Sequence, residues 1–186
     1  MVGTPVTFSY SYTGSVSPTT LLYLKVASDL RKLFGDLNGK KIVEIGVGYG
    51  GQLPVLDHIY RISQYHLFDL QPVLTLTQRC LQHHILNSSY KLCTLNQCDG
   101  LDSYYLAISN YAFSELPTHI QVKYIKKVLS KSARGYLTMN SGKGPAETTI
   151  NRLTLEQLHT LLPPFQVLDE CPLTGANNYI LVWGQS

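Results

Sequence analysis

Short apolar runs alternate with amphipathic stretches along most of the chain. The runs hold five or six residues, end at polar or glycine residues and are typical of buried strands. Besides the run that ends at Gly46, they cover residues 65–69, 90–95, 104–109 and 135–140. Apolar residues recur at helical spacing between them, over residues 52–60, 72–86 and 117–129. This alternation predicts an α/β fold with a mostly parallel sheet, right-handed crossovers and helices on both faces.

The N-terminal part carries two further patterns. Its aromatic residues Phe8, Tyr10 and Tyr12 alternate with serines, and this period of two fits a short strand or an extended arm with its rings on one side. Ser17 followed by Pro18 is typical of a helix start, and an apolar stripe continues to about residue 34. An arm and a helix are therefore expected ahead of the sheet.

The C-terminal part predicts a helix and a hairpin. Thr154 and Gln157 have the spacing of a capping box, and two prolines stop the helix at residues 163–164. The runs at 165–170 and 179–183 then fit a β-hairpin. Such a hairpin would add one antiparallel strand to the sheet.

A glycine-rich corner follows the first strand of the expected sheet, where residues 41–52 read Lys-Ile-Val-Glu-Ile-Gly-Val-Gly-Tyr-Gly-Gly-Gln. A strand, a glycine turn and a helix in that order form the nucleotide-binding corner of an open α/β sheet. Asp69 closes the next apolar run about twenty residues further on, where a carboxylate accepts hydrogen bonds from ribose hydroxyls. Gly46, Gly48 and Gly51 suit both nicotinamide enzymes and enzymes that use S-adenosylmethionine (SAM).

Three features favour SAM over a nicotinamide cofactor. Glu44 precedes the first glycine by two residues, and this acidic-x-Gly-x-Gly-x-Gly order resembles the first motif of class I SAM-dependent methyltransferases. The terminal hairpin is similar to the reversed last strand of that fold. The glycine corner also begins near residue 41, which leaves little chain for a separate dehydrogenase domain. We therefore prefer a methyltransferase to an NAD-binding oxidoreductase.

Two later stretches narrow the resemblance. Residues 109–116 read Ser-Asn-Tyr-Ala-Phe-Ser-Glu-Leu, and residues 135–142 read Gly-Tyr-Leu-Thr-Met-Asn-Ser-Gly. Together with residues 17–21 and 43–52, they resemble the sugar O-methyltransferase family of bacterial surface-polysaccharide loci. The resemblance covers most of the chain, and the stretch at 109–116 is its most specific part.

This resemblance implies a Rossmann-like class I methyltransferase fold with a seven-stranded sheet. Residues 1–34 would supply the arm and helix, and residues 35–186 the methyltransferase domain. The implied reaction transfers a methyl group from SAM to a sugar hydroxyl of a polysaccharide or nucleotide-sugar. A small-molecule O- or N-methyltransferase and a non-catalytic SAM-binding subunit remain alternatives. The chain is short at its N-terminus for this family, which leaves room for a preceding segment at the acceptor site.

The expected cofactor site centres on the glycine turn. Its backbone would hold the methionine end of SAM, while Glu44 either fixes the loop or holds a water near the amino group. Asp69 would bind the ribose or cap the next helix, and Asp99 would bind the adenine amino group or belong to a plain Asp-Gly turn. The predicted cofactor-binding residues are Glu44, Gly46, Gly48, Tyr49, Gly50, Asp69, Leu70, Asp99, Gly100 and Asn110.

The expected acceptor site follows the fourth and fifth strands of the sheet. Methyl transfer needs aligned reactants and a group that takes a proton from the acceptor. Glu115 and His119 are the candidate general bases, although Glu115 also suits a helix cap and His119 an exposed first turn. Tyr111 and Asn140 are the candidate acceptor-binding residues, although a packed turn also explains Tyr111.

Composition excludes several other classes of protein. A chain of 186 residues with 44% apolar content can bury one core, which fits a single compact domain. The net charge of +3 points to no nucleic acid partner, and a sugar or other small molecule is the expected one. The oligomeric state stays open.

The remaining motifs suggest neither a metal site nor a membrane segment. Four cysteines without a C-x-x-C pair indicate reduced thiols, and the adjacent His83 and His84 do not share a helix face. No run reaches the roughly 20 apolar residues that a membrane span needs. We therefore expect a cytoplasmic protein without a metal or a membrane span.

Overall fold

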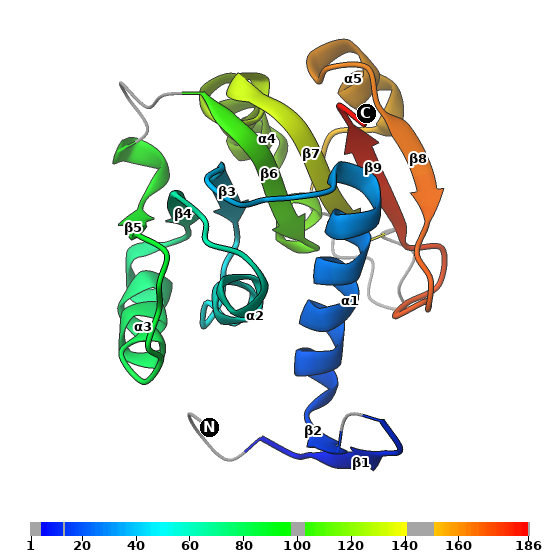
Figure 1. Cartoon of the computed structure of the whole chain (residues 1–186). Coiled ribbons are helices and arrows are strands. Elements are labelled where there is room, and N and C mark those ends of the chain that lie inside the picture. Colours follow the sequence, from blue (N-terminus) through cyan, green and yellow to red (C-terminus); the bar gives the residue numbers. More distant parts are fainter. Residues whose placement is uncertain (1–4, 13, 98–102, 141–150, 186) are drawn as a thin grey trace.

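The computed structural model describes residues 5–12, 14–97, 103–140 and 151–185. Its centre is a seven-stranded sheet with the order β5-β4-β3-β6-β7-β9-β8 (Figure 1). The strands are β3 (Lys41–Ile45), β4 (Gln64–Phe68), β5 (Tyr90–Cys93), β6 (Tyr104–Asn110), β7 (Ser132–Met139), β8 (Gln166–Asp169) and β9 (Tyr179–Trp183). Strands β5, β4, β3, β6 and β7 run parallel, whereas β9 is antiparallel to both of its neighbours. The predicted sheet with its antiparallel terminal hairpin is confirmed.

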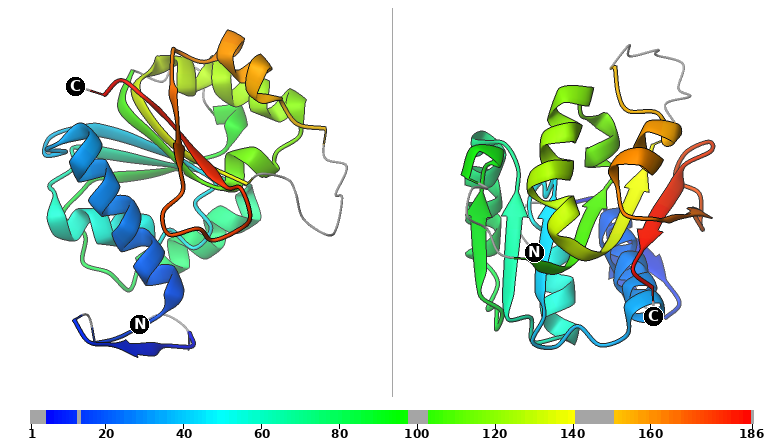
Figure 2. Two further views of the ribbon diagram at one scale, coloured as in Figure 1. Left: turned by 90° about the vertical axis from the view of Figure 1, so that its right-hand side faces the viewer. Right: turned by 90° about the horizontal axis from the view of Figure 1, so that it is seen from above.

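Helices cover both faces of this sheet (Figure 2). Helices α1 (Pro18–Phe34), α2 (Gln52–Ile59) and α3 (Gln71–Leu81) pack into one apolar core, and α4 (Thr118–Lys127) and α5 (Leu155–Leu161) pack into the other. Strand β3 contributes Ile42 to the first core and Val43 to the second, because successive side chains of a strand point to opposite faces. The short 3-10 helices are η1 (Leu95–Gln97), η2 (Ala112–Glu115) and η3 (Leu129–Lys131).

Side-chain caps set the predicted starts of α1 and α5. The Ser17 side chain accepts a hydrogen bond from the N–H of Thr20 at the start of α1, and the capping box of Thr154 and Gln157 opens α5. Helix α3 ends at Leu81 rather than near residue 86. Ile85 is 99% exposed, whereas Leu86 packs against the first core from beyond the end of the helix.

Strand β7 starts three residues earlier than its apolar run suggests. Ser132 pairs with Tyr104 of β6, and the indole N–H of Trp183 donates to the Ser132 carbonyl at 3.2 Å. Pairing with β6 and the hydrogen bond from the Trp183 side chain therefore extend β7 over residues outside its apolar run.

The N-terminal arm forms a two-stranded hairpin of β1 (Phe8–Tyr10) and β2 (Gly14–Val16), with Phe8 opposite Val16. It stands at the start of α1, away from the central sheet (Figure 1). Its aromatic rings are exposed, fully so at Tyr12. The arm thus presents aromatic surface to solvent.

Candidate cofactor and acceptor site

The glycine loop joins β3 to α2 at the carboxyl end of the parallel strands. Gly46 has a φ of 75°, and a Cβ built on it would lie 1.9 Å from the Cβ of Ala112. The segment that follows β6 therefore packs directly on the start of the loop, and only glycine fits there. Further along, Gly48 and Tyr49 are exposed, whereas Gly50 is buried against Thr77 of α3. The middle of the loop is thus open to a ligand.

Asp69 lies just beyond β4 and bonds to the glycine loop. Its Oδ2 accepts a hydrogen bond from the N–H of Gly48 at 3.2 Å, and its Oδ1 accepts one from the N–H of Leu70 at 2.7 Å. The carboxylate therefore connects the ends of two neighbouring strands, at the crevice where open α/β sheets bind ligands. Leu70 is 72% exposed and is not part of the core.

Glu44 is buried in β3 beside the loop. Its Oε2 accepts a hydrogen bond from the Tyr65 hydroxyl at 2.7 Å. Burial, with a smaller contribution from the negative charge of Asp69, raises the pKa of Glu44 to about 8, although the bond from Tyr65 acts in the opposite direction. Glu44 is therefore mostly protonated at neutral pH, and its hydrogen bond joins β3 to β4 next to the loop.

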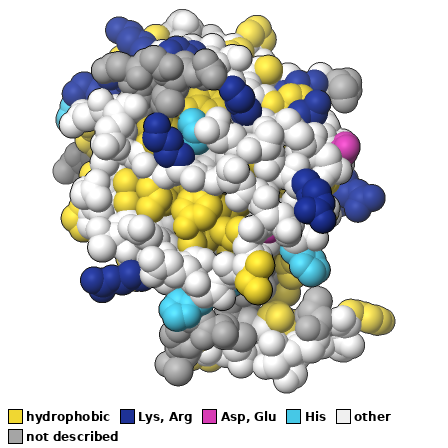
Figure 3. Space-filling view, turned by 60° about the vertical axis from the view of Figure 1, so that its left-hand side comes forward, with side chains coloured by type: hydrophobic (Ala, Val, Ile, Leu, Met, Phe, Trp, Pro, Cys, Tyr) yellow, Lys and Arg dark blue, Asp and Glu magenta, His cyan; other side chains and the backbone are white. Residues whose placement is uncertain are grey.

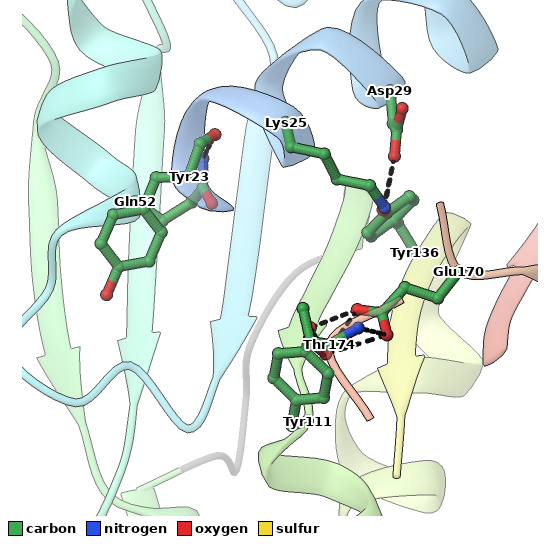
Figure 4. Close-up of polar contacts among 8 residues, drawn as sticks. All are labelled: Tyr23, Lys25, Asp29, Gln52, Tyr111, Tyr136, Glu170 and Thr174. Atoms are coloured by element: carbon green, nitrogen blue, oxygen red, sulfur yellow. Dashed lines mark hydrogen bonds and ion pairs between the residues drawn. The ribbon is translucent and has the colours of Figure 1, made fainter. Parts of the chain in front are cut away.

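Gln52, the first residue of α2, links three elements around the loop. Its Nε2 donates to the carbonyl oxygen of Tyr23 in α1 at 3.2 Å, as Figure 4 shows, and its Oε1 accepts from Nδ2 of Asn110 at 3.4 Å. The Oδ1 of Asn110 is buried and has no hydrogen-bond partner among the described residues. Buried acceptors are rarely left unpaired, so Asn110 offers a group that a bound molecule can satisfy.

Sequence reasoning missed Tyr23 and did not single out Gln52 from the glycine motif. Tyr23 packs edge-on against Tyr49, with ring centroids 5.9 Å apart, and burial together with contacts to Tyr49 raises the pKa of Tyr23. Gln52 could have been found, because it directly follows the glycine string. Tyr23 has no comparable signal, since its role depends on how α1 crosses the loop.

An apolar hollow of about 600 Å³ lies next to the same loop. It is bounded by the start of α1, the start of α2 and the second half of α3, and Figure 3 shows apolar side chains in the middle of a face above the arm. Its lining residues include Tyr23, Tyr49, Pro54, Val55, Leu76 and Leu81. The hollow suits an apolar group better than a charged one.

Tyr111 follows β6 and has an unusual backbone. Its φ is 67°, which is uncommon for a bulky residue. Its N–H donates to the Thr138 carbonyl at 2.9 Å, and its hydroxyl donates to Glu170, which follows β8. Burial and this hydrogen bond raise the pKa of Tyr111 to about 12. Tyr111 therefore lies in a packed turn, and its role in binding the acceptor stays a prediction.

Glu170 is buried with Thr174 at its side (Figure 4). One carboxylate oxygen accepts from the N–H of Thr174 at 3.0 Å, and the Thr174 hydroxyl also donates to the carboxylate. Burial by itself raises the pKa of Glu170, but the hydrogen bonds from Tyr111 and Thr174 lower it below the usual value. The carboxylate therefore stays ionised. Sequence reasoning placed Glu170 in the terminal hairpin and assigned it no functional role.

A second polar group joins α1 to β7. The Tyr136 hydroxyl donates to Oδ2 of Asp29 at 2.8 Å, and Nζ of Lys25 lies 3.1 Å from the same hydroxyl and 2.9 Å from Asp29 (Figure 4). Burial, and next the charge of Asp29, raise the pKa of Tyr136. These three residues line a smaller cavity of about 170 Å³ that extends to Cys171. Sequence reasoning missed this group as well.

The remaining acceptor candidates are only partly brought together. Asn140 donates from Nδ2 to Oε1 of Glu115 at 2.7 Å, and its N–H donates to the Ser114 hydroxyl at 2.9 Å. Glu115 is exposed and does not cap α4. His119 is exposed in the first turn of α4, and no hydrogen bond joins it to Glu115 or Asn140 among the described residues. Glu115 and Asn140 therefore form a hydrogen-bonded pair, and His119 is not part of it in the region that the structure describes.

Two predicted cofactor residues, Asp99 and Gly100, lie outside the described residues. Within the described ranges no group of three or more His, Cys, Asp or Glu side chains could hold a metal ion. None of the helices described combines the length and apolar content that a bilayer crossing requires.

Comparison with known proteins finds matches by structure but none by sequence. No protein-family model matches the chain, and no curated protein sequence matches it. Many solved structures match its fold. One is the magnesium protoporphyrin IX methyltransferase of Synechocystis with bound SAM, at 16% identity and a TM-score of 0.63, covering 88% of this chain and 78% of that one.

Two other neighbours have different activities. The mitomycin 7-O-methyltransferase MmcR is 13% identical with a TM-score of 0.60, over 87% of this chain and 53% of that one. An rRNA methylase from Streptococcus thermophilus is 17% identical with a TM-score of 0.54, over 90% of this chain and 95% of that one. Likeness at this level of identity defines a fold and no substrate. The chain has the Rossmann-like fold of class I methyltransferases.

Proposed function

We propose that this chain is a SAM-dependent methyltransferase. The observation that carries the proposal is the hydrogen bond from the Gly48 N–H to Asp69, which joins the glycine loop to a carboxylate at the end of the next strand. Glycine backbone and a strand-end carboxylate are the groups that bind an adenosine cofactor in open α/β sheets. Structural neighbours with bound SAM or S-adenosylhomocysteine support the same cofactor.

The residues present fit this cofactor. Bound SAM would supply a methyl group activated by a sulfonium. The open backbone around Gly48 would hold its methionine end, Asp69 would accept from the ribose hydroxyls, and the unpaired Oδ1 of Asn110 would accept from a further donor. Glu44 would hold the loop or a water at the amino group. The other proposed contacts are Gly46, Tyr49, Gly50, Leu70, Asp99 and Gly100.

The acceptor we propose is a sugar hydroxyl of a polysaccharide or nucleotide-sugar. Tyr111, the Glu115–Asn140 pair and Asn110 supply hydroxyl, carboxylate and amide groups that orient hydroxyls. Glu115 and His119 are the candidate proton acceptors that the sequence predicts. In this scheme residues 35–186 form the catalytic domain and residues 1–34 add the arm and α1.

The setting we propose is the cytoplasm. The thiols of Cys80, Cys93 and Cys171 are unpaired, which fits a reducing compartment.

A second candidate is a small-molecule methyltransferase whose acceptor has an apolar part. The observation that favours it is the apolar hollow beside Tyr49 and Gly50. An acceptor with an aromatic or aliphatic group would bury that group there, next to the loop. Sugars would gain little from the same surface.

Calorimetry with SAM, S-adenosylhomocysteine and NAD tests the cofactor. We expect binding of the first two and no comparable binding of NAD. Preferential binding of NAD would replace the methyltransferase proposal with an oxidoreductase.

A turnover assay tests the activity and the acceptor. S-Adenosylhomocysteine is measured with UDP-glucose and methyl glucoside as sugars and with catechol as an aromatic hydroxyl compound. Product with a sugar supports the first candidate, and product with catechol alone supports the second. SAM binding without product from any of them would favour a non-catalytic subunit.

A further inference from the structure

Tyr111 lies beside the glycine loop. Strand β6 pairs with β3 so that Ile108 is opposite Glu44, and the chain reaches Tyr111 three residues later, level with the loop. Asn110 contacts Gln52 at the end of the loop, and Ala112 packs on Gly46 at its start. Tyr111, between Asn110 and Ala112, therefore lies between the glycine loop, where we propose that SAM binds, and the proposed acceptor site.

The Tyr111 hydroxyl is bound in a way that leaves its oxygen able to accept. A hydroxyl carries one proton and two lone pairs. The Tyr111 hydroxyl donates its proton to the Glu170 carboxylate, and the Thr174 hydroxyl lies within hydrogen-bond distance of both that carboxylate and the Tyr111 oxygen, 2.8 Å from the latter. Tyr111 thus donates inward and can accept a hydrogen bond from a hydroxyl that arrives from the crevice.

The backbone at Tyr111 is held in its uncommon conformation from several directions. Its N–H donates to Thr138, and its carbonyl accepts from the N–H of Ser114 at 3.0 Å and from the Ser114 hydroxyl at 2.6 Å. Bulky residues with positive φ persist where the surroundings fix them, and such residues cluster at functional sites. The arrangement fixes the direction of the ring.

We propose that Tyr111 and Glu170 form the pair that accepts the proton of the acceptor hydroxyl, an inference that rests on the proposed methyl transfer. As the acceptor oxygen attacks the methyl carbon, the carbon–sulfur bond breaks and its electrons stay on sulfur. The acceptor proton passes to the Tyr111 oxygen while the Tyr111 proton passes to Glu170. Thr174 acts as a positioning residue because its N–H and hydroxyl hold the carboxylate.

This pair has features that the other base candidates lack. Glu170 is 2% exposed and is held by Tyr111 and Thr174, whereas Glu115 and His119 are exposed. The Oε1 of Glu115 is also bound by Asn140. Tyr136 of β7 also interacts electrostatically with Tyr111, and its hydroxyl is bound by Asp29 and Lys25 of α1. A buried, oriented pair fixes the path of a proton better than an exposed side chain does.

The test compares Tyr111→Phe and Glu170→Gln with two matched controls. Tyr105→Phe removes a hydroxyl that bonds to the Phe34 carbonyl on α1, and Glu156→Gln changes an exposed side chain of α5. Single-turnover rates are measured at saturating SAM with whichever of UDP-glucose, methyl glucoside or catechol the wild type methylates. We expect both site variants to be at least tenfold slower with unchanged S-adenosylhomocysteine affinity and both controls to keep the wild-type rate.

A readout without turnover is the titration of Glu170 followed by nuclear magnetic resonance of labelled glutamate carboxyls. The pKa of Glu170 should rise in Tyr111→Phe, because that variant removes a hydrogen bond to the carboxylate. An unchanged Glu170 titration, or full rates in both site variants, overturns the pair. If Glu115→Gln or His119→Gln lowers the single-turnover rate instead, the residue changed in that variant accepts the proton. If the wild type binds SAM but methylates none of the three compounds, the proposed function fails first and the pair fails with it.

Discussion

The two sides of the crevice are built differently. On the side of β3 and β4, the groups facing the crevice are mostly backbone atoms of the glycine loop, held by Asp69. On the side of β6 and β7, they are side chains that come from distant parts of the chain. Tyr111 and Glu170 are 59 residues apart, and Asp29 and Tyr136 are 107 apart.

This difference indicates how each side tolerates change. A backbone site depends on a few glycines and admits little variation in sequence. A site made of side chains from several elements can change its chemistry through single substitutions while the fold stays the same. Other folds that host many activities behave in this way. The neighbours that act on a porphyrin, on mitomycin and on rRNA share this frame.

The strongest test of the backbone side is Gly46→Ala. The new Cβ would lie 1.9 Å from the Cβ of Ala112 at a φ of 75°. We expect a loss of about 2 to 5 kcal/mol in the free energy of unfolding, from strain and overpacking together. Urea unfolding measures this loss. In the control Gly39→Ala the φ is also positive but the space is open, so strain alone should cost about 1 kcal/mol. Equal losses of unfolding free energy in Gly46→Ala and Gly39→Ala would show that Ala112 moves aside without cost.

The pH dependence of stability tests the buried carboxyl on the same side. Because the pKa of Glu44 is raised to about 8, the folded chain binds this proton more tightly than the unfolded chain. The contribution to stability is full below the usual carboxyl pKa and is lost as the pH rises through about 8. We expect a fall of about 5 kcal/mol across this window, which Glu44→Gln should remove. Tyr65→Phe removes a hydrogen bond that lowers the pKa of Glu44, so the fall should become larger and extend to higher pH, and a flat wild-type profile would contradict the burial of Glu44.

Asp69→Ala should affect the donor and leave the acceptor side intact. The carboxylate is the group that we expect to accept from the ribose, so SAM binding should weaken by about 1.5 to 3 kcal/mol. Calorimetry measures the loss, and the titration of Glu170 on the opposite side should not move. Unchanged SAM affinity would mean that other groups hold the ribose.

On the side of β6 and β7, the substitution that matches Asp69→Ala is Tyr136→Phe. It removes the hydroxyl that Asp29 and Lys25 share, while the Lys25–Asp29 ion pair at 2.9 Å remains. The free energy of unfolding should drop by about 1 kcal/mol, with SAM affinity unchanged. Urea unfolding beside Tyr105→Phe as a control gives the comparison. A large loss of SAM affinity would show that the two sides are not separable.

The same contrast explains what could be predicted from the sequence. The mostly parallel sheet, the terminal hairpin and the strand, turn and helix of the glycine corner follow from local periodicity and from residues close in sequence, and these predictions are confirmed. The bond between Gly48 and Asp69 could be anticipated from their spacing. Local signals suffice where neighbouring strands bring the groups together.

The acceptor side could not be predicted in the same way. Glu170 lies in a stretch that only predicts a hairpin, and Lys25 and Asp29 lie on a helix whose apolar stripe gives no hint of Tyr136. Their meeting depends on how α1 and the β8–β9 connection cross the strand ends. The end of α3 was misjudged for a related reason, because Ile85 continues an apolar pattern but faces solvent.

Helix α1 touches both halves of the crevice within two residues. The Tyr23 carbonyl bonds to Gln52 beside the glycine loop, and Lys25 bonds to Tyr136 on the other half. A helix is stiff, so a tilt that follows occupation of the loop would also move Lys25. In the proposed methyltransferase such a movement would link the affinities for donor and acceptor, and each ligand should then change the dissociation constant of the other by the same factor.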